Sequence, residues 1–178
     1  PLLFRSGDWA NYLIGAMLRA RFETRHTPPR GIEAVVASDL PRGAALSSSH
    51  ALCTATLLAG LAANGAALDA RGLILAVRDA EWYTGARTGA SDQGAEILGG
   101  LGQLVNAVLF PDGLDLSGLR RIAFPAGLAV IVANSFTRRN LSGAQRTAYV
   151  TNRFAYSMAL AILRREMTSM GFDAATAA

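Results

Sequence analysis

The chain has 178 residues and is 51% hydrophobic and 17% charged, which excludes extensive disorder and suits one domain or part of two. All 17 basic residues are arginines dispersed without interleaved aromatic residues, so the net charge of +4 does not indicate nucleic-acid binding, and the absence of lysine excludes a Walker-type phosphate loop. With one cysteine and two histidines, the chain can form neither an intrachain disulfide nor a zinc site of the Cys/His class, and we expect a cytoplasmic protein.

The first predicted element is an amphipathic helix over residues 8–22. Asp8 is the expected N-cap, because its carboxylate can accept a hydrogen bond from a free backbone N–H of the first turn. Trp9, Leu13 and Met17 recur at helical spacing, so we expect them on one apolar face.

A proline-containing break at residues 26–30 separates this helix from a predicted strand over residues 32–37, which are rich in β-branched side chains. A loop over residues 39–49 then leads into an uncharged helix that ends near Asn64. The uncharged run 51–68 has the length of a membrane span, but its polar residues and many alanines favour a helix buried in the protein. We therefore expect no membrane segment.

Further helices are expected after this run. Asp69 predicts the N-cap of a helix that runs to about Tyr83, and a stretch rich in glycine and threonine separates it from a short helix over residues 91–98. A mixture of such helices and strands without strict alternation favours the α+β class.

The remaining residues are expected to form two to four strands between residues 103 and 134, followed by one long helix over residues 143–167. Turns are predicted at residues 111–113 and 125–127, where proline and glycine occur together. The clearest strand is predicted over the apolar run 128–133.

The segment of greatest functional interest lies between the predicted strand and the uncharged helix. Gly43 permits an unusual backbone turn, and Ser47, Ser48 and Ser49 open the helix. Backbone N–H groups and the positive end of the helix dipole favour an anion such as phosphate, and the hydroxyls could add hydrogen bonds or reach magnesium. The alternative is an ordinary serine N-cap with further polar residues.

Two carboxylates, Glu81 and Asp92, flank a glycine-rich stretch. Phosphoryl transfer needs a metal ion held against the phosphates and a group that positions or deprotonates the acceptor hydroxyl, and two carboxylates suffice for these roles. The alternative is structural: a glutamate at a helix end and an aspartate that the helix dipole favours in a first turn.

The serine segment resembles the second motif of the GHMP kinases, the family of galactokinase, homoserine kinase and mevalonate kinase. Pro41, Leu46 and the three serines match this motif, whereas Ala45 stands where the family usually has glycine and His50 where it usually has a small residue. His50 could touch phosphate, but a position on the helix surface is favoured. The resemblance implies ATP binding by Gly43, Ala45, Leu46, Ser47, Ser48 and Ser49.

The carboxylates lie in a context that resembles the galactokinase branch, which has Ala-Glu, a spacer with glycine and then Gly-x-Met-Asp-Gln. The resemblance implies that Glu81 and Ser49 bind Mg²⁺, that Asp92 is the catalytic aspartate, and that Gly89 and Asp92 contact a sugar. Galactokinases supply an arginine to the catalytic aspartate from an amino-terminal signature that is not found here, and Arg87 is not assigned this role.

The resemblance extends over nearly the whole chain, from residue 9 to residue 166, and implies the fold. It predicts a ribosomal-protein-like ATP-binding domain over residues 1–125 and the start of a ferredoxin-like domain over residues 126–178. The third, glycine-rich family motif is not found, so we expect the central part of a longer kinase, or a degenerate relative, that is monomeric at full length.

The function implied is transfer of the γ-phosphoryl group of MgATP to a monosaccharide hydroxyl. An alternative is a sensor that binds ATP and sugar and acts through a protein partner, and another is a kinase for an isoprenoid or amino-acid hydroxyl. The presence of Glu81 and Asp92 favours a kinase over a sensor.

Overall fold

The computed structural model describes residues 7–24, 30–41, 44–85, 87–108, 114–133, 136 and 144–171. The chain divides into two compact units, Pro1–Arg139 and Asn140–Ala178, and each is described by itself. The described residues form helices and one antiparallel strand pair, which confirms the α+β class. In chain order the elements are α1 (Ala10–Thr24), α2 (Ser48–Ala63), α3 (Ala70–Trp82), α4 (Ser91–Leu98), β1 (Gln103–Val108), β2 (Asp115–Ala123) and α5 (Ala144–Ser169).

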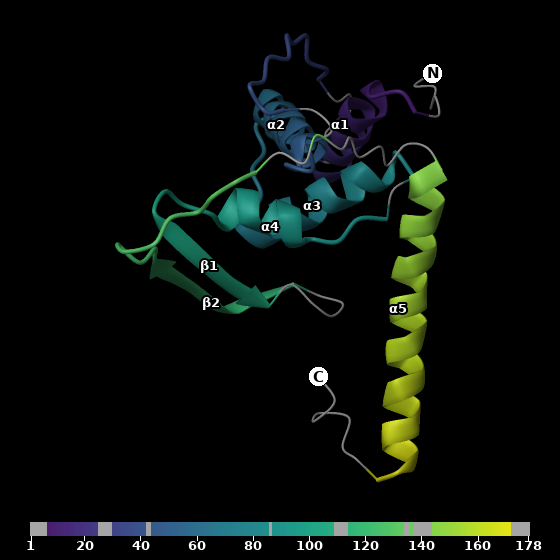
Figure 1. Cartoon of the computed structure of the whole chain (residues 1–178). Coiled ribbons are helices and arrows are strands. Elements are labelled where there is room, and N and C mark those ends of the chain that lie inside the picture. Colours follow the sequence, from purple (N-terminus) through teal and green to yellow (C-terminus); the bar gives the residue numbers. More distant parts are fainter. Residues whose placement is uncertain are drawn as a thin grey trace. The chain divides into compact units, whose positions relative to one another are not determined.

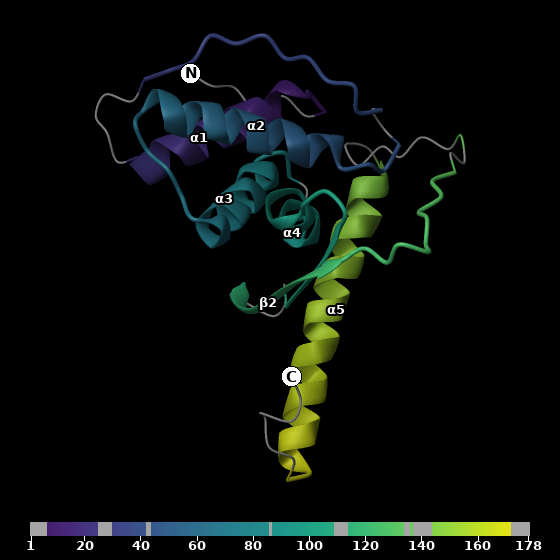
Figure 2. The same cartoon turned by 90° about the vertical axis from the view of Figure 1, so that its left-hand side faces the viewer.

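The first unit is built in layers, with α1 and α2 side by side, α3 and α4 beneath them, and the strand pair against α3 and α4 (Figures 1 and 2). One core cluster joins α1, α2 and α3, and its buried members are Ala16, Ala20, Cys53, Leu57, Leu61, Ala76, Val77 and Ala80. The lack of charge in α2 therefore reflects burial among other helices, as expected. Among the described residues, no helix combines the length and apolar character needed to cross a bilayer.

Helix α1 begins as predicted, because the Asp8 carboxylate accepts a hydrogen bond from the Ala10 N–H at 2.9 Å. Its buried face differs from the predicted one, since Trp9 precedes the helix and is 58% exposed. The residues that α1 buries are small or polar: Asn11, Gly15, Ala16 and Ala20.

Small residues on this face let the helix backbones approach closely. A Cβ atom added at Gly15 would lie 2.2 Å from the Ala80 carbonyl oxygen, far inside contact distance. Helices that pack this closely need small residues at the contact. The spacing of large apolar side chains, on which the predicted face was based, does not show where these contacts lie.

Helices α3 and α4 match their predicted bounds. The Asp69 carboxylate accepts a hydrogen bond from the Gly72 N–H at 2.6 Å and caps α3, which ends one residue before Tyr83. Helix α4 spans Ser91–Leu98, the residues predicted for it.

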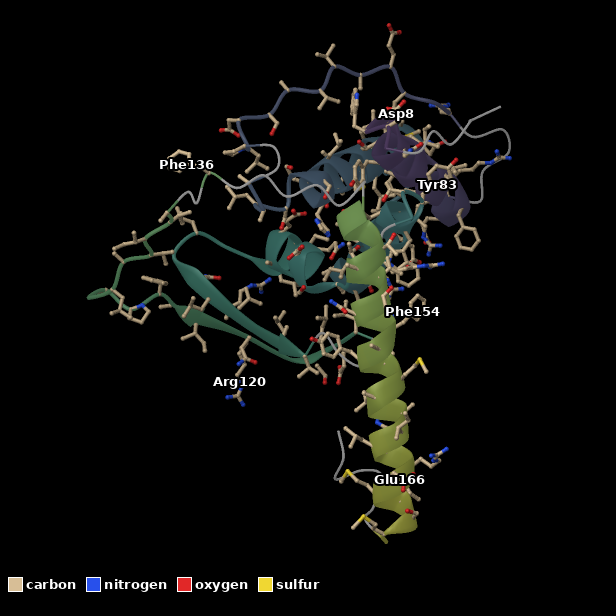
Figure 3. All side chains as sticks on the ribbon, turned by 45° about the vertical axis from the view of Figure 1, so that its right-hand side comes forward. Asp8, Tyr83, Arg120, Phe136, Phe154 and Glu166 are labelled. Carbon is tan, nitrogen blue, oxygen red and sulfur yellow. The ribbon has the colours of Figure 1, made fainter. Side chains whose placement is uncertain are left out.

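Strands β1 and β2 pair antiparallel, with Gln103 opposite Ala123 and an irregularity in register between Asn106 and Val108. A second core cluster joins the strand pair to α3 and α4, and its buried members are Ile74, Ala90, Leu98 and Leu114. On the other side, the side chain of Arg120 extends outward from β2 (Figure 3).

Two predicted strands are wrong. Residues 32–37 and 128–133 are described, but neither segment is a strand, and Val35 and Ile131 are 97% and 90% exposed. β-branched residues favour an extended backbone, but a strand also requires a partner, and no described residue pairs with either segment. The turn after Pro125 is confirmed by the 3.1 Å hydrogen bond from the Leu128 N–H to the Pro125 carbonyl.

The second unit contains α5, which lies within two residues of its predicted bounds. Most of its described side chains are exposed, including Phe154 at 58%. Of the break predicted at residues 26–30, only residue 30 is described, and the turn predicted at residues 111–113 lies outside the described residues. The ferredoxin-like start and the domain boundary after residue 125 stay predictions.

Candidate active site

Three helix ends meet at the candidate site: the first turn of α2, the last turn of α3 and the first turn of α4. They bring together Ser49, Glu81 and Asp92, which lie far apart in the sequence. The Ser49 hydroxyl donates a hydrogen bond of 2.8 Å to Glu81 Oε1. His50 reaches both carboxylates, with its Nε2 atom 2.7 Å from Glu81 Oε2 and 3.5 Å from Asp92 Oδ2.

Glu81 is buried, with 2% of its surface exposed, and both of its carboxylate oxygens have partners. Ser49 lies at Oε1, while the Thr88 hydroxyl donates a 2.5 Å hydrogen bond to Oε2, which also faces His50. A buried carboxylate needs such contacts because desolvation otherwise disfavours its charge. The structure therefore holds Glu81 in one defined orientation.

The expectation that His50 lies on the helix surface is wrong, since only 5% of it is exposed. Position 50 lies on the side of α2 that faces the end of α3 and the start of α4. The Nε2 contact with Glu81 is an ion-pair contact that lacks the alignment of a hydrogen bond. Burial lowers the pKa of His50, but Glu81, Asp92 and Glu96 together outweigh burial, so the pKa is raised above its usual value.

The side chain of Asp92 is 49% exposed, in contrast to the buried Glu81. One turn later on α4, Glu96 accepts a 3.1 Å hydrogen bond from the Thr54 hydroxyl on α2. Partial burial raises the pKa of Glu96, and the charges of Asp92 and Glu81 act in the same direction. The site is therefore rich in negative charge, and the carboxylates of Asp92 and Glu96 are accessible to solvent whereas that of Glu81 is buried.

The oxygen donors at the site fit Mg²⁺. The 2.8 Å between Ser49 Oγ and Glu81 Oε1 is close to the roughly 3 Å that separates adjacent ligands at Mg–O distances of about 2.1 Å in an octahedron. In the described residues, no group of three or more His, Cys, Asp or Glu side chains is arranged to hold a metal. Magnesium commonly uses one or two protein ligands together with water and substrate phosphates, so a pair suffices.

The serine loop enters α2 through an unusual backbone. Ala45 and Ser47 both have left-handed conformations, with φ angles of 57° and 55°. The Ser47 side chain makes no capping hydrogen bond, although its carbonyl accepts from the Ala51 N–H at 3.1 Å. The start of α2 therefore lacks the serine cap of the structural alternative, and its amide groups favour an anion.

The other residues of the predicted phosphate loop lie around this turn. Leu46 is 44% exposed, Ser48 is half-buried at the first position of α2, and Gly43 lies outside the described residues. Gly89 is half-buried in the segment before α4. The structure thus unites Ser49, Glu81 and Asp92, while nothing described joins Gly89 to them.

Tyr12 of α1 is a residue that the sequence did not assign to the site. Its side chain lies near Ser49 and Thr84, and burial, with the nearby Glu81 and Cys53, raises the pKa of its hydroxyl. The available signal in the sequence was the spacing of Trp9, Tyr12 and Gly15, at the start of the region that resembles the family.

Trp82 follows Glu81 directly and connects to the same network. Its indole Nε1 donates a 2.9 Å hydrogen bond to the carbonyl of Thr88, whose hydroxyl contacts Glu81. The guanidinium groups of Arg78 and Arg87 both lie over the Trp82 ring, each 4.7 Å from its centroid. Arg87 therefore makes a cation–π contact with the indole.

Comparison with known proteins supports the resemblance. The chain is 34% identical over 158 residues to a galactokinase from Chloroflexus aggregans, and this alignment covers 88% of this chain and 38% of the relative. It is 33% identical over 139 residues to a galactokinase from Chloroflexus aurantiacus, covering 78% of this chain and 34% of the relative. The chain thus spans less than two-fifths of the length of these relatives, and no solved structure matches it.

The family comparison covers the part of the chain that builds the site. Residues 11–100 match the GHMP kinases N terminal domain, and this range contains the serine loop, His50 and both carboxylates. Because the match spans half of the chain and includes the residues that converge in the structure, the chain belongs to the GHMP kinase family.

Proposed function

We propose that this chain is the ATP-binding part of a sugar kinase that transfers the γ-phosphoryl group of MgATP to a monosaccharide hydroxyl. The observation that carries the proposal is the convergence of Ser49, Glu81 and Asp92 from three helix ends beside the uncapped start of α2. The similarity to two galactokinases supports a sugar as the acceptor.

The start of α2 and its serines bind the phosphates, because the helix dipole and the backbone N–H groups favour negative charge. Ser49 and Glu81 hold the magnesium ion, which when bound neutralises charge that develops on the phosphates. Asp92 orients or deprotonates the acceptor hydroxyl. Its 49% exposure suits this role, since an acceptor can reach it, whereas the buried Glu81 is held by protein groups.

The test is ADP release from MgATP with a panel of hexoses and pentoses, using the longest polypeptide that the source encodes. Turnover with one sugar is the expected result. Asp92→Asn should abolish ADP release and leave MgATP binding within about threefold, because the carboxylate acts on the acceptor and not on the nucleotide. Loss of nucleotide binding by a folded Asp92→Asn protein would refute the role of Asp92.

A sensor is the second candidate, and the departures from the family pattern at Ala45 and His50 favour it. Ala45 places a methyl group in a left-handed turn, and His50 occupies one side of Glu81. A sensor would bind ATP and a sugar saturably without releasing ADP. That result would replace the kinase proposal and direct the search to a protein partner. Cytoplasmic location and a monomeric state stay predictions.

A further inference from the structure

We propose that His50 is a positioning residue that joins Glu81 and Asp92 into one unit, so that the carboxylate facing the acceptor is fixed relative to the carboxylate facing the metal. The inference rests on the proposed function and concerns the same site. It assigns a role to a residue that replaces the small residue usual at this position in the family.

The geometry of the imidazole carries the inference. A single atom, Nε2, lies 2.7 Å from Glu81 Oε2 and 3.5 Å from Asp92 Oδ2. The other ring nitrogen, Nδ1, lies 3.4 Å from the Ser49 hydroxyl. The ring therefore spans three residues from three helices, and its burial restricts it to few rotamers.

Asp92 has few other restraints. In the part of the chain that the structure describes, no other side chain forms an ion pair with it, and half of its side chain is exposed. The segment between α3 and α4 is tied to Glu81 through Thr88, whereas the described side chain that contacts both carboxylates is His50. Two nearby carboxylates also repel each other unless a donor lies between them. His50 is placed to hold them together.

Such a restraint matters for phosphoryl transfer, in which positioning supplies most of the rate enhancement. A displacement of about 1 Å in a reacting group can lower a rate by about 100-fold. Losing the link between Glu81 and Asp92 should therefore lower kcat more than it weakens nucleotide binding.

Thr88 offers a matched control, because its hydroxyl contacts the same Glu81 oxygen as His50, and among the described hydrogen bonds it makes none to Asp92. If His50 acted only by orienting Glu81, Thr88→Val and His50→Ala would have similar effects. If His50 positions Asp92, His50→Ala has the larger effect on kcat.

The kinetic test compares His50→Ala, His50→Gln and Thr88→Val in the longest polypeptide. His50→Ala should lower kcat by about tenfold or more at saturating MgATP and sugar, with the KM for MgATP changed less than about threefold. His50→Gln should recover part of this loss, since its amide keeps an N–H donor near the Nε2 position. An unchanged kcat in His50→Ala, or an equal loss in Thr88→Val, would overturn the proposal.

A second measurement needs no turnover. Thermal unfolding of His50→Ala, Asp92→Ala and the double variant gives the coupling between the two side chains. We expect the two Tm shifts to deviate from additivity by about 2 °C or more, and additive shifts would overturn the link. Coupling in a protein that phosphorylates no sugar would support the link while refuting the proposed function, so the two failures are distinguishable.

Discussion

Two side chains that depart from the family pattern, Ala45 and His50, lie at this site. The methyl group of Ala45 sits in a left-handed turn, and the imidazole of His50 fills a space beside Glu81 where a small side chain would leave room. Left-handed φ angles disfavour residues with a Cβ atom, which explains in backbone terms why glycine is usual at position 45 in the family. The first prediction concerns this position.

Ala45→Gly should stabilise the protein by up to about 1 kcal/mol, because relief of left-handed strain exceeds the added flexibility of the unfolded chain. It should also strengthen MgATP binding, since the backbone could approach phosphate more closely. Urea unfolding and calorimetric titration measure the two effects. Ala44→Gly is the matched control: Ala44 has no left-handed φ, so this change should destabilise by about 0.5–1 kcal/mol. Equal effects of the two substitutions would contradict the strain argument.

The candidate site was predicted in part. Ser49, Glu81 and Asp92 came from residue chemistry and family resemblance, and the structure brings them together. His50 was missed, because burial of a helix residue depends on which distant segments pack against it. Its departure from the family pattern was the available signal, and the sequence alone could not say which groups it would face.

At the scale of elements, local signals determined the helices well. The N-caps Asp8 and Asp69 predicted the starts of α1 and α3, and the helices expected over residues 91–98 and 143–167 match α4 and, within two residues, α5. The strands at residues 32–37 and 128–133 failed because strand formation depends on a partner that local sequence does not specify. The contribution of the capping residues to stability can therefore be tested by substitution.

Asp69→Ala should destabilise the protein by about 1 kcal/mol, because the Gly72 N–H loses its acceptor at the start of α3. Asp69→Asn keeps an acceptor oxygen and should cost less. Ser47→Ala should change stability by less than about 0.5 kcal/mol, since the Ser47 side chain does not cap α2. Urea unfolding gives all three values, and a loss in Ser47→Ala as large as that in Asp69→Ala would show that Ser47 does cap α2 in solution.

At the scale of the whole molecule, the described core belongs to the first unit. Ile97 contacts both core clusters, so the helical layers and the strand pair share one continuous interior. Cys53 lies inside the helical cluster with no exposed surface, and its thiol faces the Tyr12 carbonyl at 3.7 Å. Cys53 is the one cysteine of the chain, so reaction of a thiol reagent with the protein measures how readily this core opens.

Burial raises the pKa of the Cys53 thiol, with smaller contributions from Glu81 and Glu96. Native protein should therefore resist a thiol reagent between pH 7 and pH 9, while protein in urea should react, and faster as pH rises through about 8.5. The folded state keeps a proton that the unfolded state loses, so stability should fall as pH rises above about 8.5. Cys53→Ala gives the background rate, and rapid labelling of native protein would contradict the burial.

The indole of Trp82 gives this site a built-in optical reporter. The chain has two tryptophans, and the other, Trp9, is 58% exposed. A soluble quencher should therefore quench the fluorescence of Trp9. Trp82 is hydrogen-bonded to Thr88, whose hydroxyl is hydrogen-bonded to Glu81. A ligand that binds the Glu81 carboxylate should therefore alter the surroundings of the indole ring. With Trp9 replaced by phenylalanine, emission from Trp82 would follow the occupancy of the site in real time and without a label.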